Sequence, residues 1–145
     1  MVTATIRAAK AEDQATIRRI IRAANLNRMS LDWPNFLIAE DAGEVVGIGQ
    51  VKTHRDGSRE LASIAVVPAR QGQGIGSAIV NALLVRHGGG VLHLTCQGKN
   101  EGYYARFGFR RIPRQELPPY FARLLPIMNV FARLARTEII VMRRG

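Results

Sequence analysis

The sequence predicts an α/β fold in which a mixed sheet carries helices on its faces. A helix-like segment, Ser77–Val85, separates two strand-like segments, Ile64–Val67 and Val91–Thr95. Strands that are joined through a crossover helix run parallel in one sheet. The other apolar segments are short and joined by turn residues, which is typical of antiparallel hairpins. One parallel pair among hairpins indicates a single mixed, mainly antiparallel sheet with helices on both faces.

The N-terminal segments predict a strand, a helix and a break. Thr5–Ala9 is expected to form the first strand, and Ala11–Asp13 begins a helix with acidic residues in its first turn. The segment Asn25–Pro34 interrupts the pattern, with room for a short helix around Arg28–Ser30. The apolar face of the first helix is expected to consist of Ile17, Ile20, Ile21 and Ala24.

A hairpin and a polar loop follow. Phe36–Glu40 and Val45–Val51 are apolar segments of strand length, and Asp41–Glu44 between them has turn chemistry. His54–Arg59 is polar and centred on an Asp-Gly pair, which favours a loop.

The second half predicts two further strands at its end. His87–Gly90 is expected to end the crossover helix, and Glu101–Arg106 is helix-like up to Gly108. Phe109–Ile112 and Glu138–Met142 are predicted to be the closing strands.

Residues 117–135 form an additional amphipathic helical segment before the last strand. Apolar side chains recur there at helical spacing, and Pro126 is expected to kink or divide the helix. We favour a helix packed on its own domain, and a substrate-site lid, a dimer contact and a membrane-surface helix remain alternatives. The predicted packing stripe consists of Tyr120, Leu124, Ile127 or Met128, and Phe131.

Composition sets broad limits on the protein. The 145 residues, 47% of them hydrophobic, fit one domain over residues 1–145. The sequence shows neither a secretory signal nor an 18-residue apolar run, so a cytoplasmic protein without a membrane span is expected. A single cysteine, Cys96, excludes an intrachain disulfide, and the three histidines lack ligand spacing, so no metal is expected.

Positive charge is concentrated in the second half of the chain. Residues 61–145 contain 12 Lys/Arg and 3 Asp/Glu, within a net charge of +10. Such a field attracts an anionic cofactor or an acidic substrate. Simple solubility charge and nucleic-acid binding remain open explanations.

A glycine-rich loop joins the central strand to the crossover helix. Three glycines at alternate positions expose backbone N–H groups at a helix start, which favours an anion such as phosphate. A P-loop would need a lysine after Gly76, and a dinucleotide fingerprint would need a G-x-G-x-x-G spacing with a later acidic residue. The segment Gln71–Gly76 instead satisfies the pattern Gln/Arg-x-x-Gly-x-Gly/Ala.

These features resemble the GNAT superfamily of N-acetyltransferases over about residues 3–112 and the last strand. Ile64–Val66 is similar to the family strand whose backbone pairs with the pantetheine arm of the cofactor. Tyr104–Phe109 is similar to the family signature Tyr-x-x-x-Gly-Phe. The resemblance implies the acyl-CoA N-acyltransferase fold, with a central parallel strand pair that splays apart, and acetyl-CoA as co-substrate.

The resemblance also implies roles for individual residues. Tyr104 is the implied general acid near the CoA sulfur, and the adjacent Tyr103 remains an alternative. Glu60 is the candidate base because it opens the cofactor strand in an otherwise acid-free stretch, and a water relay is the alternative. The implied cofactor-binding residues are Ile64, Ala65, Val66, Gln71, Gly72, Gln73, Gly74, Ile75, Gly76, Ser77 and Asn100.

The implied function is acetyl-CoA-dependent transfer of an acetyl group to a primary amine, by direct attack in a ternary complex. The acceptor is expected to be a small-molecule or peptide amine, and the basic second half favours acceptors that carry a carboxylate. The alternative is a non-catalytic CoA-sensing or basic nucleic-acid-binding module. A membrane partner is not expected, and a homodimer remains open.

Overall fold

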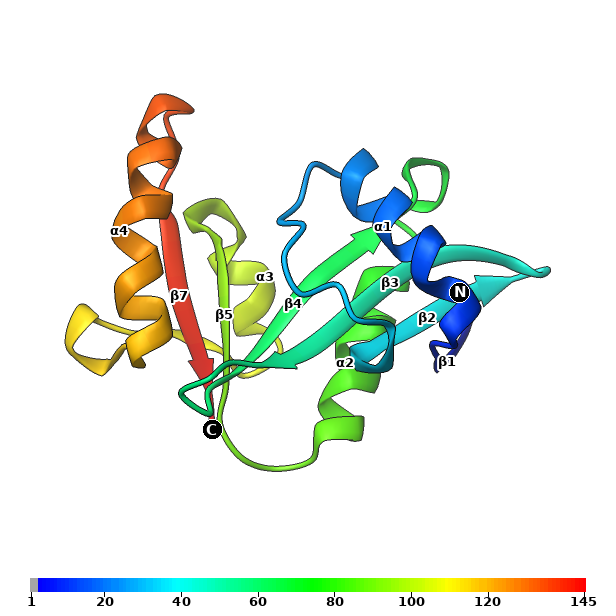
Figure 1. Ribbon diagram of the computed structural model, residues 1–145, viewed down its shortest axis with the longest axis horizontal. Coiled ribbons are helices and arrows are strands. Elements are labelled where there is room, and N and C mark those ends of the chain that lie inside the picture. Colours follow the sequence, from blue (N-terminus) through cyan, green and yellow to red (C-terminus); the bar gives the residue numbers. More distant parts are fainter. Residues whose placement is uncertain (1–2) are drawn as a thin grey trace. The chain divides into compact units, whose positions relative to one another are not determined.

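The computed structural model describes residues 3–145, which divide into two compact units (Figure 1). The first unit comprises the chain up to Lys52 together with Leu61–Gly88, and the second comprises Thr53–Glu60 and Gly89–Gly145. The strands are β1 (Thr5–Ala8), β2 (Phe36–Asp41), β3 (Glu44–Thr53), β4 (Arg59–Val66), β5 (Leu92–Gln97), β6 (Arg110–Arg111) and β7 (Ile139–Arg144). The α-helices are α1 (Gln14–Ala23), α2 (Ile75–His87), α3 (Glu101–Ala105) and α4 (Pro119–Leu134).

The strands form a mixed sheet with the hydrogen-bonded order β1-β2-β3-β4-β5-β7-β6. Neighbours are antiparallel in the β1–β2, β2–β3, β5–β7 and β6–β7 pairs. β4 and β5 are parallel, with Glu60 opposite His93, and both residues belong to the second unit. The predicted mixed sheet with one parallel pair is therefore confirmed, and the splay of that pair beyond Glu60 stays a prediction.

In the first unit, α1 and α2 cover opposite faces of the strands (Figure 1). Ile38 and Ile48 pack in one cluster with the buried isoleucines of α1. The alternate residues of β3 face α2, and a Cβ at Gly49 would lie 2.6 Å from Ile79 Cγ2. Glycine on this strand therefore lets α2 approach the sheet backbone closely.

Two expectations for this unit are wrong in detail. Ala24 is the exposed C-cap of α1 rather than part of its buried face. No helix forms around Arg28–Ser30, because Ser30 has a left-handed φ of 56°, which a right-handed helix does not accept. A 3₁₀ turn forms later instead, at Trp33–Asn35, where Pro34 supplies a preset φ near the start.

The second unit is built around β5 and β7, with α4 packed along β7 (Figure 1). The register of β5 with β7 runs from Leu92 opposite Arg144 to Gln97 opposite Ile139. A core of Ile112, Phe121 and Val141 joins the end of β6, α4 and β7.

α4 forms in the predicted segment, but Pro126 does not divide it. A proline removes one intrahelical hydrogen bond, and contacts near both ends hold this helix. The backbone N–H of Tyr120 donates to Asp56 near its start, and near its end the Asn129 side chain bonds the backbone of Ile139.

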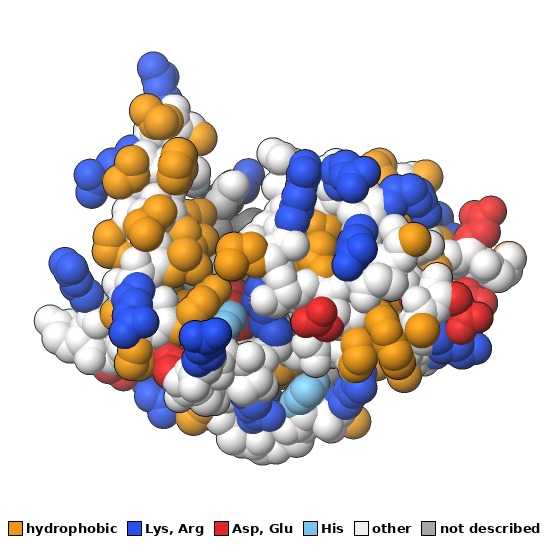
Figure 2. Space-filling view, viewed as in Figure 1, with side chains coloured by type: hydrophobic (Ala, Val, Ile, Leu, Met, Phe, Trp, Pro, Cys, Tyr) orange, Lys and Arg blue, Asp and Glu red, His pale blue; other side chains and the backbone are white. Residues whose placement is uncertain are grey.

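The predicted packing stripe of α4 is also displaced. Phe121 and Ala132 are the buried side chains, whereas Ile127 is 58% and Phe131 is 68% exposed. Figure 2 shows hydrophobic side chains along this outer face of α4. The helix is apolar on two faces, and contacts with Ile112 and Val141 decide which one is buried.

No helix in residues 3–145 has the length and apolarity that crossing a lipid bilayer requires.

Candidate active site

The glycine loop presents backbone rather than side chains before α2. Gly72 has a φ of 78° and Gly74, the N-cap of α2, has a φ of 83°, so both occupy the left-handed region that favours glycine. No side chain caps this helix, and the N–H of Ala78 donates to Gly74 O. The N–H groups of Ile75 and Gly76 therefore lie in the first turn, where a helix offers donors to an anion.

Side-chain contacts fix the loop to its own unit. The Gln71 amide donates to Val66 O at 3.1 Å, which ties the loop to the end of β4. Arg70 forms an ion pair with Asp41 at 2.8 Å and donates to Gln73 Oε1 at 3.0 Å. These contacts order the loop while Gly72 and Gly74 remain exposed.

Tyr104 lies on α3, in the second unit. Burial raises the pKa of its phenol to about 12, and nearby Tyr103 and Cys96 add to the effect. Its ring lies 5.0 Å from the Tyr103 ring and 6.4 Å from the Phe109 ring, in edge-to-face contacts. The phenol therefore stays protonated near neutral pH.

Glu60 forms a pair with His54, which sequence reasoning did not identify. Glu60 is 7% exposed, and its Oε1 lies 2.8 Å from His54 Nε2. The loop between them brings the two side chains together, since the backbone N–H of His54 donates to the backbone oxygen of Ser58 at 2.9 Å. A histidine and a glutamate on either side of a short polar loop were the available sequence signal.

Aromatic contacts fix the imidazole of this pair. The His54 ring stacks on the Tyr120 ring, with centroids 3.4 Å apart and an interplanar angle of 13°. The Phe121 ring meets His54 edge-on at 5.8 Å. The imidazole is thus held by a carboxylate at one nitrogen and by rings from α4.

Asp56 connects the same loop to α4. Its Oδ2 accepts the Tyr120 backbone N–H at 2.9 Å, and its Oδ1 accepts the Ser58 backbone N–H at 2.9 Å and the Ser58 hydroxyl at 2.6 Å. These hydrogen bonds, led by that of the Ser58 side chain, lower the pKa of Asp56 to about 2. The carboxylate is therefore charged at neutral pH, and both of its oxygens accept hydrogen bonds.

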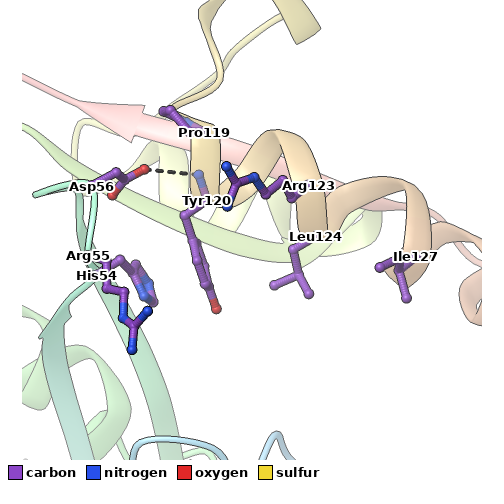
Figure 3. Close-up of a pocket in the computed structure, with 8 residues that line it drawn as sticks. All are labelled: His54, Arg55, Asp56, Pro119, Tyr120, Arg123, Leu124 and Ile127. Carbon is purple, nitrogen blue, oxygen red and sulfur yellow. Dashed lines mark hydrogen bonds between the residues drawn. The ribbon is translucent and has the colours of Figure 1, made fainter.

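A pocket of about 620 Å³ opens between this loop and α4 (Figure 3). Figure 3 shows Tyr120, Leu124 and Ile127 projecting from α4 to one side, with His54 and Arg55 beside the Tyr120 ring. The lining residues are His54, Arg55, Asp56, Pro119, Tyr120, Arg123, Leu124 and Ile127.

A family comparison explains the order of these features along the chain. The sequence profile described as "Acetyltransferase (GNAT) domain" matches residues 32–111, more than half of the chain. The chain belongs to the GNAT acetyltransferase family. The predicted family and the predicted enzyme class, an N-acetyltransferase, are confirmed. Among curated proteins, none matches this chain significantly.

Solved structures support the GNAT fold. N-acetylglutamate synthase from Neisseria gonorrhoeae, complexed with coenzyme A and N-acetyl-glutamate, superposes with a TM-score of 0.76 at 22% identity, covering 99% of this chain and 35% of its own. Rv2747 from Mycobacterium tuberculosis, in complex with CoA and NLQ, has a TM-score of 0.71 at 21% identity, with 97% and 98% covered. The ribosomal-protein-S18-alanine N-acetyltransferase from Escherichia coli has a TM-score of 0.64 at 20% identity, with 97% of this chain and 92% of that chain covered.

The chain spans about a third of the length of the Neisseria enzyme, with 35% of that chain covered. The coenzyme A bound in that enzyme and in the Mycobacterium protein agrees with acetyl-CoA as the predicted co-substrate of this GNAT chain.

The predicted GNAT cofactor residues occupy different surroundings. Gln71–Gly74 is exposed, and Gly76, Ser77, Ile64 and Val66 are half-buried. The side chains of Ala65 and Ile75 face the core of the first unit, so only their backbone is available to a ligand. Asn100 is exposed at the N-cap of α3, in the second unit.

Cys96 has no catalytic setting in this GNAT domain. Burial raises the pKa of its thiol to about 11, and Glu101 adds to the effect, so the thiol stays protonated and weakly nucleophilic. Within residues 3–145, no group of three or more His, Cys, Asp or Glu side chains is arranged to hold a metal ion.

Proposed function

We propose that this chain transfers an acetyl group from acetyl-CoA to a primary amine, by direct attack within a ternary complex. Membership of the GNAT family supports the reaction class. The observation that carries the proposal is the loop before α2, where Gly72 and Gly74 adopt left-handed φ values and no side chain caps the helix. A side chain at these positions would strain the backbone that has to approach a pyrophosphate.

The cofactor roles are assigned to residues that the sequence pattern selects. The backbone of Gln71–Ser77 would hold the pyrophosphate, and that of Ile64–Val66 would pair with the pantetheine amides. The left-handed φ of 60° at Ser63 interrupts the regular strand just before this segment. Asn100 is the remaining proposed contact to the cofactor.

The proposed chemistry uses the two proton-handling groups of the second unit. The acceptor nitrogen forms a bond to the thioester carbonyl carbon, and the carbon–sulfur bond then breaks. Tyr104 gives its proton to the departing thiolate. The amine proton passes to His54, whose Nε2 is held by Glu60, so Glu60 acts through the imidazole. The products are the N-acetylated amine and the free CoA thiol.

Titration calorimetry with acetyl-CoA, together with thiol release against an amine panel, tests this function. We expect saturable cofactor binding and release of one thiol per acetylated amine. Absence of binding at millimolar acetyl-CoA contradicts the proposal. Steeply salt-dependent binding to random RNA without any thiol release would favour the nucleic-acid module instead. The single-domain organisation and the cytoplasmic location stay predictions.

A further inference from the structure

Two arginines in the pocket have no carboxylate partner. Arg55 comes from the loop after β3, and Arg123 comes from α4 (Figure 3). Neither side chain makes an ion pair or a hydrogen bond within residues 3–145, although other arginines of this unit pair with Glu116 and Glu138. Asp56 shares the lining, but its two oxygens already accept bonds from Tyr120 and Ser58. The lining therefore carries a net positive charge, with two guanidinium groups against one carboxylate.

The rest of the lining is mainly apolar. Leu124, Ile127 and Pro119 supply aliphatic surface, and Tyr120 adds an aromatic ring. A volume of about 620 Å³ lies within the range of sites for small organic ligands. A ligand that fits this lining has an anionic group next to apolar surface.

His54 places a candidate general base in the wall of the pocket. Its ring lines the cavity, and its Nε2 is bonded to the buried Glu60. A ligand in the pocket therefore lies beside the group to which we assign the acceptor proton.

We infer that this pocket binds the acceptor, and that the acceptor is a primary amine carrying a carboxylate beside an apolar side chain. The inference rests on the proposed function, because only an acetyl transfer requires an amine here. The positive charge of Arg55 and Arg123 attracts the carboxylate, and Leu124 and Ile127 contact the apolar part.

Matched pairs of acceptors test the inference. L-Leucine, L-methionine and L-phenylalanine are each compared with the corresponding carboxamide, and thiol release from acetyl-CoA is measured. The members of a pair differ only in the carboxylate. Since the amine of a carboxamide is less basic and more of it is unprotonated, the chemical bias runs against the expected result. We expect kcat/KM to be at least about tenfold higher for the carboxylates, as a charge-assisted hydrogen bond supplies.

Variants of the two arginines assign the effect to the pocket. Arg55→Ala and Arg123→Ala should each remove most of the preference by raising KM for the carboxylates. Arg133→Ala is the matched control, because Arg133 is on the same helix but does not line the pocket. All three positions are exposed, so thermal melting should show unchanged stability.

The outcomes separate this inference from the proposed function. Equal rates for carboxylates and carboxamides, or turnover only of amines without a carboxylate such as spermidine, overturns the inference and leaves acetyl transfer intact. Absence of thiol release with every amine removes the proposed function. In that event the acceptor role of the pocket is overturned as well, and calorimetry with L-leucine tests only its carboxylate site: binding that is lost in Arg123→Ala and kept in Arg133→Ala supports that site, and binding that is unchanged or absent in all proteins overturns it.

Discussion

The Nε2 atom of His54 lies 2.8 Å from Oε1 of Glu60, and this contact changes the interpretation of the candidate base. The Glu60 side chain is buried, whereas the His54 ring that it contacts lines a pocket. A carboxylate behind a histidine fixes the orientation of the ring. The two side chains are therefore expected to act as one group.

Substitutions in this pair should have non-additive effects on turnover. Glu60→Gln and His54→Phe should each lower kcat by about 100- to 10,000-fold, in line with the loss of general-base assistance. Phenylalanine keeps an aromatic ring against Tyr120 while removing both nitrogens. The double variant should be no slower than the worse single variant, because residues that act as a unit are not additive.

Steady-state kinetics with calorimetric measurement of acetyl-CoA affinity checks this expectation. Affinity should remain unchanged in all three proteins. Glu116→Gln, at an exposed ion pair with Arg110, serves as the control. Multiplied effects in the double variant would show that the two side chains act independently.

Tyr104→Phe should lower kcat by about 100- to 10,000-fold while leaving acetyl-CoA affinity nearly unchanged. The loss of the hydroxyl would matter only in the step in which the thiolate leaves. Because the pKa of Tyr104 is raised to about 12, its ionisation should cause no loss of rate in the wild type below about pH 10. Tyr103→Phe is the adjacent control, and equal losses in both variants would leave the acid unassigned between them.

The hairpins and the crossover unit could be predicted because their signals are local. Turn residues separate β2 from β3, and the apolar segments around α2 have the lengths of buried strands. The glycine loop could likewise be predicted from local sequence, since Gly72 and Gly74 occupy positions that require left-handed φ values.

Other features depend on contacts that no local pattern encodes. His54 gains its setting from Glu60 across a loop and from Tyr120 on a distant helix. The buried face of α4 could not be chosen from spacing, because Tyr120 and Phe121 begin two apolar stripes one position apart. Packing of Phe121 with Ile112 and Val141 makes the choice.

Alanine at Gly72 should weaken acetyl-CoA binding beyond its effect on stability. A Cβ at Gly72 meets open space, so the folded protein is strained only by the left-handed φ of 78°, at a cost of about 1 kcal/mol. Gly43→Ala is a matched control, since its φ is 80° and its surroundings are also open. Urea unfolding should show similar losses in both variants, while calorimetry should show weaker cofactor binding for Gly72→Ala alone. Equal cofactor affinity in the two variants would remove the loop from the cofactor site.

His93 should make the stability of the protein fall as the pH drops below 6.5. It is 4% exposed, and neither ring nitrogen has a hydrogen-bond partner within residues 3–145. Burial lowers its pKa from 6.5, Arg143 lowers it further, and Asp56 opposes the shift. Below pH 6.5 the unfolded chain therefore takes up a proton that the folded chain excludes, whereas above pH 6.5 both states are neutral.

Urea unfolding between about pH 8 and about pH 5.5 measures this effect as the difference between the wild type and His93→Leu. The wild type should lose up to about 1.4 kcal/mol of unfolding free energy per pH unit more than the variant below pH 6.5. Leucine retains an apolar contact for Phe121 and has no titrating group, so the other titrating residues cancel in the comparison. Identical pH slopes for the two proteins would mean that His93 binds its proton equally well in the folded state, in a site more polar than its burial indicates.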